Sequence, residues 1–162
     1  KVVVRLKGGD PLVFSRGIEE VLYLRSKKVN FEVVQGITSA FSVPESFGIP
    51  LTRKGKYSSV AVLTGRKSNN QKLDAPACDT LVYLMAVSNI ENVVKKLLTS
   101  GRKKNTPCAF IENGTTSKER IITANLGNVI KRARESCVKA PAVLIVGEVV
   151  RYGKRIYGHK FK

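Results

Sequence analysis

A β-branched run that ends in two glycines and a proline limits most strongly how this chain can fold. Residues 2–6 have the composition of a buried strand, and the tetrapeptide Gly-Gly-Asp-Pro at 8–11 follows directly. Glycine admits positive φ angles and proline cannot continue a ladder, so the strand must end there. A helical pattern begins near Arg16. Strand, glycine turn and helix in this order are typical of open α/β sheets, which bind ligands at the carboxyl ends of their strands.

Further strands and helices are expected to alternate along the rest of the chain. A first helix should end at Asn30, and a second, which Thr38 or Ser39 could cap, contains Pro44. A capping box at residues 88–91 predicts a third helix, and Asn125 could cap a fourth. A polar stretch through Asn69 and Asn70 predicts a loop. The expected strands are residues 31–34, 59–63, 80–85, 108–111, 120–124 and 142–146, and the residues from Arg151 onward should form a basic tail.

The stretch 49–56 combines proline, glycine and a charge run, which is typical of a linker. We therefore expect residues 1–52 to be the end of a first α/β domain and residues 57–162 to be a second one. The chain opens directly on a predicted strand, without an initiator methionine. This start predicts a carboxy-terminal fragment whose first domain is incomplete.

Composition narrows the class of partner and of chemistry. The formal net charge of +17 on 162 residues is typical of a protein that binds nucleic acid or a small polyanion, although many lysines fall on predicted helix surfaces. The sequence lacks a phosphate-binding loop motif and a dinucleotide-binding glycine motif, which disfavours a nucleotide-phosphate enzyme. Three scattered cysteines and a single histidine, His159, predict reduced thiols in a cytosolic protein and no metal site.

The run R-L-K-G-G-D-P-L-V-F-S-R-G-I-E-E at residues 5–20 closely resembles the signature of uroporphyrinogen-III C-methyltransferases, in the tetrapyrrole methylase family. Three later stretches, residues 35–40, 48–52 and 111–115, match the same family in the right order. The resemblance reaches about Gly147. The chain departs from the family pattern at Ser15, at Gln35, and at the Arg53-Lys54 pair, where the family has histidine and arginine.

The resemblance implies a two-domain α/β fold that binds S-adenosylmethionine in the cleft between its domains. It also implies two C-methylations of uroporphyrinogen III, which give precorrin-2 for siroheme or cobalamin, and it implies a homodimer, which we expect to be cytoplasmic. The sequence contains no apolar run of eighteen residues, so no membrane partner is expected, and a nucleic-acid partner is disfavoured. Met85, taken alone, reads more readily as a core residue, and Asn113-Gly114 as a simple turn. Carried over residue by residue, the implied cofactor-binding residues are Gly8, Gly9, Asp10, Val13, Thr38, Ser39, Met85 and Gly114.

The substrate carboxylates require cations, since arginine can hold a carboxylate through two hydrogen bonds. Arg16 is the strongest candidate because it belongs to the matched run; Arg5, Lys7, Arg53 and Lys54 are weaker ones. No catalytic acid or base can be named in this chain. A methylase of a later precorrin remains an alternative, and so does a basic RNA-binding or RNA-modifying domain. A valine at Gly8 or at Gly114 is expected to block cofactor binding and leave the secondary structure intact.

Overall fold

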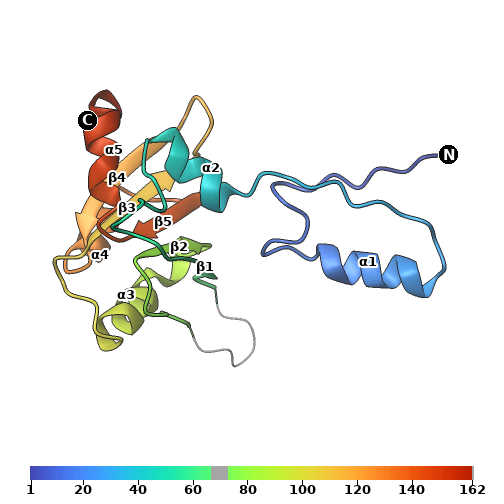
Figure 1. The fold of residues 1–162 in the computed structure, drawn as a ribbon, viewed down its shortest axis with the longest axis horizontal. Helices are drawn as coiled ribbons and strands as arrows, with labels where there is room; N and C mark the ends of the chain where they lie inside the picture. The colour runs from blue at the N-terminus through green and yellow to red at the C-terminus, as the bar shows by residue number, and fades with distance from the viewer. Residues whose placement is uncertain (67–72, 162) are drawn as a thin grey trace. The chain divides into compact units, whose positions relative to one another are not determined.

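The computed structural model describes residues 1–66 and 73–161 of the chain (Figure 1). It divides into two compact units, Lys1–Ser39 and Ala40–Lys162, and each is described here by itself. The loop expected through Asn70 lies outside the described residues. The first unit ends well before the predicted linker at 49–56, and Arg53 of that linker forms an isolated antiparallel bridge with Tyr57 in the second unit. The expected division into two α/β domains stays a prediction.

The first unit contains one regular element, helix α1 at Gly17–Ser26. Glu19 and Glu20 occupy its first turn, where the helix dipole favours negative charge. The predicted strands at residues 2–6 and 31–34 are wrong, because both segments are extended but unpaired and largely exposed. A β-branched run becomes a strand only beside a ladder partner, and the described residues of this unit supply none. The helix also ends at Ser26 rather than at Asn30.

The second unit is built on a five-stranded sheet with the order β1-β2-β5-β3-β4. Strands β1 and β2 are parallel, whereas β5 runs antiparallel to both of its neighbours, β2 and β3. Strands β1, β2 and β3 consequently end at the same edge of the sheet. The predicted strands match well, with bounds of Val60–Thr64 (β1), Thr80–Leu84 (β2), Pro107–Glu112 (β3), Arg120–Asn125 (β4) and Ala142–Val146 (β5).

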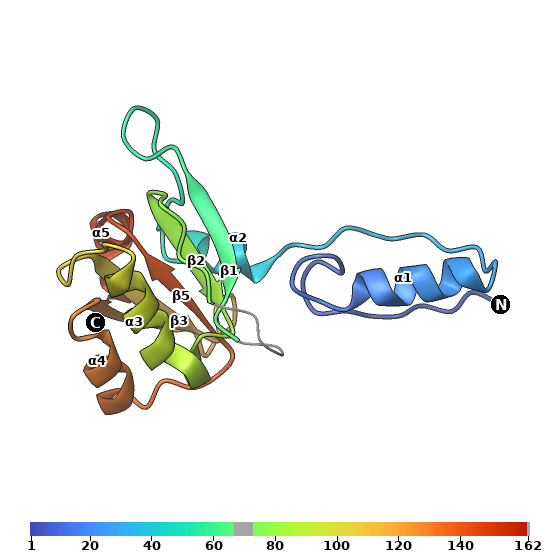
Figure 2. The same cartoon turned by 90° about the horizontal axis from the view of Figure 1, so that it is seen from below.

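Helices cover both faces of this sheet, which makes the expected α/β class correct (Figure 2). Alternate strand residues point to opposite faces: in β3, Phe110 packs under α3 (Ile90–Thr99) and α4 (Val129–Glu135), and Ile111 packs under α2 (Ser39–Ser46) and α5 (Val150–Ile156). The sheet thereby separates two buried cores.

Three local expectations in this unit are wrong. Ser88 lies in a 3₁₀ turn, Val87–Asn89, and α3 starts after Asn89 without a side-chain cap bond, so the capping box does not form. The residue at the start of α4 is Asn128 rather than Asn125. The basic tail contains helix α5, whose Val150 and Gly153 are buried. This helix has few apolar residues at helical spacing, because many of its side chains are charged and exposed, so hydrophobic periodicity does not predict it.

Candidate functional site

The two glycine turns of the first unit lie side by side and are joined by Asp10. One oxygen of its carboxylate, Oδ1, accepts a hydrogen bond from the Leu12 amide at 2.9 Å. The other, Oδ2, accepts one from the Gly36 amide at 3.0 Å. A Cβ on Gly36 would overlap the backbone of Gly9, so the turns approach this closely only with glycine there. Two motifs 26 residues apart in sequence therefore form one corner.

The same hydrogen bonds set the charge of this corner. The amides of Gly36 and Leu12 favour the carboxylate form, and they lower the pKa of Asp10 below its ordinary value despite a small opposing effect of burial. Asp10 is thus an ionised, fixed acceptor at neutral pH. This arrangement suits a binding role and not proton transfer.

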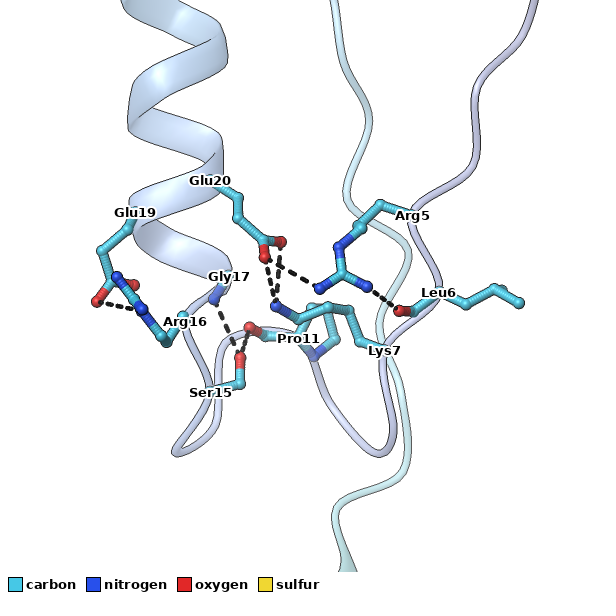
Figure 3. A network of polar contacts seen from close by, with 9 residues as sticks. All are labelled: Arg5, Leu6, Lys7, Pro11, Ser15, Arg16, Gly17, Glu19 and Glu20. Carbon is cyan, nitrogen blue, oxygen red and sulfur yellow. Dashed lines mark hydrogen bonds and ion pairs between the residues drawn. The ribbon is translucent and has the colours of Figure 1, made fainter.

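Helix α1 is anchored to the first turn through Ser15 (Figure 3). The Ser15 hydroxyl donates to the carbonyl of Pro11 and accepts from the Gly17 amide at 3.1 Å. This link satisfies one of the free amides at the helix start. It also fixes the loop that carries Val13, which is partly exposed.

The cations of the matched run differ in availability (Figure 3). Glu20 binds the ammonium group of Lys7 at 3.0 Å and the guanidinium group of Arg5 at 3.5 Å. Arg16 has an 85% exposed side chain, and its pairing with Glu19 is loose, at 4.0 Å. Arg16 is therefore the cation of this run that an anionic ligand could most easily recruit.

Thr38 and Ser39 follow the corner directly. Ser39 is the first residue of α2, and Thr38 precedes it, two residues after Gly36. A Cβ on Gly9 would meet the carbonyl oxygen of Ile37 at 3.7 Å, so this segment runs alongside the first turn. Of the predicted site residues, the first unit brings together Gly8, Gly9, Asp10 and the chain leading to Thr38.

Met85 and Gly114 lie at one edge of the sheet in the second unit. Met85 comes directly after β2, and Gly114 comes two residues after the end of β3. Strand β5 runs between them in the opposite direction, and its preceding residue, Pro141, accepts a hydrogen bond from the Asn113 amide at 3.0 Å. The two corners are thus separated by two strand spacings, about 10 Å.

Met85 is not a core residue, so the prediction that it only fills the hydrophobic core is wrong. Its side chain is 43% exposed, and its backbone adopts a φ of +55°. Positive φ is unfavourable for a bulky residue and persists where the surrounding structure enforces it, as at ligand sites. The structure therefore presents a polarizable side chain at the carboxyl end of a strand.

Gly114 is required by packing against α2. A Cβ there would lie 2.5 Å from Cγ1 and 2.7 Å from Cγ2 of Val43, a buried residue of α2. Gly114→Val would therefore disturb the packing of α2 as well as the turn, and the expectation that it leaves the secondary structure intact stays a prediction. Arg53, by contrast, precedes β1 and contacts the ring of Tyr152, which puts it at the end of the sheet opposite to Met85.

Glu119 holds the turn that contains Gly114, a role that the sequence alone does not reveal. One oxygen of its carboxylate accepts hydrogen bonds from the Thr115 amide at 3.0 Å and from the Ser46 hydroxyl at 3.2 Å. The other binds the Lys160 ammonium group at 2.8 Å. An acid within a polar stretch of residues 115–120 carries no signal that could have identified this role.

No group of three or more potential metal ligands occurs among the described residues, and none of their helices is long and apolar enough to cross a membrane. A cavity of about 320 Å³ opens between the start of α3 and α4, near Asn89, Phe110 and Arg134, and none of the predicted site residues lines it.

Residues 1–130 match the family model described as Tetrapyrrole (Corrin/Porphyrin) Methylases. The chain is 46% identical over 156 residues to the uroporphyrinogen-III C-methyltransferase of Methanocaldococcus jannaschii, covering 93% of this chain and 64% of that protein. It is 43% identical over 157 residues to the S-adenosyl-L-methionine-dependent uroporphyrinogen III methyltransferase of Methanosarcina barkeri, covering 93% and 62%. The chain thus spans less than two thirds of the length of either relative.

A solved structure is similar over the same range. The uroporphyrin-III C-methyl transferase of Thermus thermophilus, crystallised with S-adenyl homocysteine, superimposes with a TM-score of 0.78 at 41% identity. The match covers 92% of this chain and 67% of that one.

Proposed function

The chain belongs to the tetrapyrrole methylase family, and from this membership we propose that the full-length protein transfers methyl groups from S-adenosylmethionine to uroporphyrinogen III. Two such transfers to pyrrole carbons give precorrin-2, the precursor of siroheme and cobalamin. The proposal is supported by relatives at 46% and 43% identity that carry this activity in their names.

The hydrogen bond from the Gly36 amide to the Asp10 carboxylate is the observation that carries the proposal. It joins the two sequence motifs that match the family most closely, and it leaves bare glycine backbone on both sides of an ionised carboxylate. Exposed amides and carbonyls of this kind suit a ligand that needs close backbone approach. The cationic sulfonium and amino groups of S-adenosylmethionine are also compatible with a nearby negative charge.

We propose that Gly8, Gly9, Asp10 and Val13 bind the cofactor together with Thr38 and Ser39, and that Met85 and Gly114 contribute from the second unit. Met85 supports this assignment, because an exposed thioether is well suited to contact an adenine or a sulfur atom. When bound, S-adenosylmethionine supplies an activated methyl group that a nucleophilic ring carbon can attack in line. The role of these residues is to align the two reactants and exclude water.

We propose that Arg16 binds a carboxylate of the tetrapyrrole. Its exposed guanidinium group lies in the loop that leads from the Asp10 corner into α1, and its partner Glu19 is only weakly held. Substitution of this residue should weaken substrate binding more than cofactor binding. We further infer a cytoplasmic homodimer; the three free cysteines suit a reducing compartment.

Calorimetric titration of the full-length protein with S-adenosylhomocysteine tests the assignment. Wild-type protein should bind, and Gly8→Val should abolish binding while the circular dichroism spectrum stays unchanged, because a Cβ at Gly8 meets nothing within 4 Å. Unchanged binding by the variant would remove Gly8 from the site. Absence of binding by the wild type, with RNA binding that weakens steeply as salt rises, would instead favour a nucleic-acid protein.

A further inference from the structure

We infer that Glu119 is a positioning residue for the cofactor turn Asn113–Thr115. We also infer that Lys160, near the carboxyl end of the sequence, holds the Glu119 carboxylate in position. This inference rests on the proposed function, because it assumes that Gly114 contacts the cofactor. It assigns a role in methyl-donor binding to two residues that need not touch the donor.

The turn needs an external support because its backbone is unfavourable. Asn113 has a φ of +48° and Thr115 a φ of +66°, on either side of Gly114. Neither residue is a glycine, so these conformations are less favourable than extended or helical backbone and persist where neighbouring groups enforce them. Within the turn, the Thr116 hydroxyl donates to the Asn113 carbonyl at 2.7 Å.

Glu119 provides that support from outside the turn. Its carboxylate accepts the Thr115 amide, so it fixes the residue that directly follows Gly114. It also accepts the hydroxyl of Ser46 in the last turn of α2, the helix whose Val43 packs against Gly114. The carboxylate therefore ties the turn to the helix that forms its wall.

Lys160 completes this arrangement. Its ammonium group binds Glu119 at 2.8 Å and the carbonyl oxygen of Ser46 at 2.9 Å, and it lies 5.1 Å from the centre of the Phe47 ring. The side chain of Glu119 is only 19% exposed, which strengthens such contacts relative to those in bulk water. Burial opposes ionisation of Glu119, but the hydrogen bonds from Lys160 and Thr115 lower its pKa overall.

The test measures cofactor affinity and turnover separately in the full-length protein. Glu119→Ala and Lys160→Met should each raise the Kd for S-adenosylhomocysteine and the KM for S-adenosylmethionine about tenfold, the equivalent of one lost charge-assisted hydrogen bond. The kcat at saturating cofactor should change little. Lys160→Arg, which keeps the cation, should restore most of the affinity.

Glu91→Ala is the matched control, because Glu91 also pairs with a cation, the guanidinium group of Arg134. Glu91 lies in the first turn of α3, on the face of the sheet opposite to α2. It should leave the Kd and the KM unchanged. If Lys160→Met lowers the thermal midpoint but not the affinity at 25 °C, the role is merely structural and the inference fails. If wild-type protein does not bind S-adenosylhomocysteine at all, the proposed function fails instead.

Discussion

The two units contain similar β-branched runs with opposite fates. Val2, Val3 and Val4 of the first unit are 72–93% exposed and pair with no described strand. Leu144 and Ile145 of β5 in the second unit are fully buried, with β2 on one side and β3 on the other. Composition is nearly the same in the two places. The difference shows that strand-forming residues acquire their structure from neighbouring strands and not from their own preference.

The polar contacts differ in the same way. Glu112, at the end of β3, is a buried acid that Arg120 and the Lys139 amide satisfy. In the first unit, Glu20 binds Arg5 and Lys7 at a partly exposed site. Burial in the second unit makes each partner indispensable, whereas water can replace a partner in the first.

The largest expected contrast comes from truncating one leucine in each unit. Leu144→Ala should lower the free energy of unfolding by about 3 kcal/mol, because it leaves a cavity between the sheet and the helices α3 and α4. Leu6→Ala should change it by less than about 0.5 kcal/mol, since Leu6 is 81% exposed. Urea unfolding of the 162-residue chain measures both values. Equal losses would show that residues 2–6 are buried in solution.

An intermediate contrast is expected from the two ion pairs. Arg120→Met should cost about 3 kcal/mol, because Glu112, whose side chain is 3% exposed, loses its cation. Lys7→Met should have a much smaller effect, since Glu20 is 39% exposed and retains Arg5. Chemical denaturation again provides the measurement. A Lys7→Met effect as large as that of Arg120→Met would contradict the distinction drawn between the units.

The smallest effect concerns the pH dependence of the Asp10 corner. The folded-state pKa of Asp10 is lowered, so its contribution to stability is fully present above its unfolded value of about 3.9 and is lost as the pH falls through the folded pKa. NMR titration should show a midpoint below that value for the Asp10 carboxyl. Asp10→Asn should remove the acid-induced shift of the Gly36 amide. A midpoint at or above 3.9 would mean that the two turns are not joined.

The sequence predicted the second unit far better than the first. The central strands β2, β3 and β5 coincide with apolar runs between turn residues, as at residues 142–146, because burial on both faces demands such runs. Helix α5 escaped prediction, since its Arg151, Lys154 and Arg155 resemble a solvated tail and only two of its positions are buried. Strand order could not be predicted, because no local pattern specifies that β5 lies between β2 and β3.

The candidate site was predictable only in part, for a related reason. Gly8, Gly9, Asp10 and Gly36 stand in motifs whose residue types reveal a tight turn, and the structure joins them. The packing of Gly114 against Val43 and the contacts of Glu119 depend on segments that meet only after folding. The spacing of residues in the sequence does not predict such tertiary contacts.

The position of β5 keeps the two corners at one separation even where the amino-acid sequence changes. The gap between the corners after β2 and β3 is set by two rows of backbone hydrogen bonds, which do not depend on side-chain identity. The sheet therefore fixes the distance between the two corners. Loops beyond either corner can be exchanged or lengthened while the two corners keep their separation.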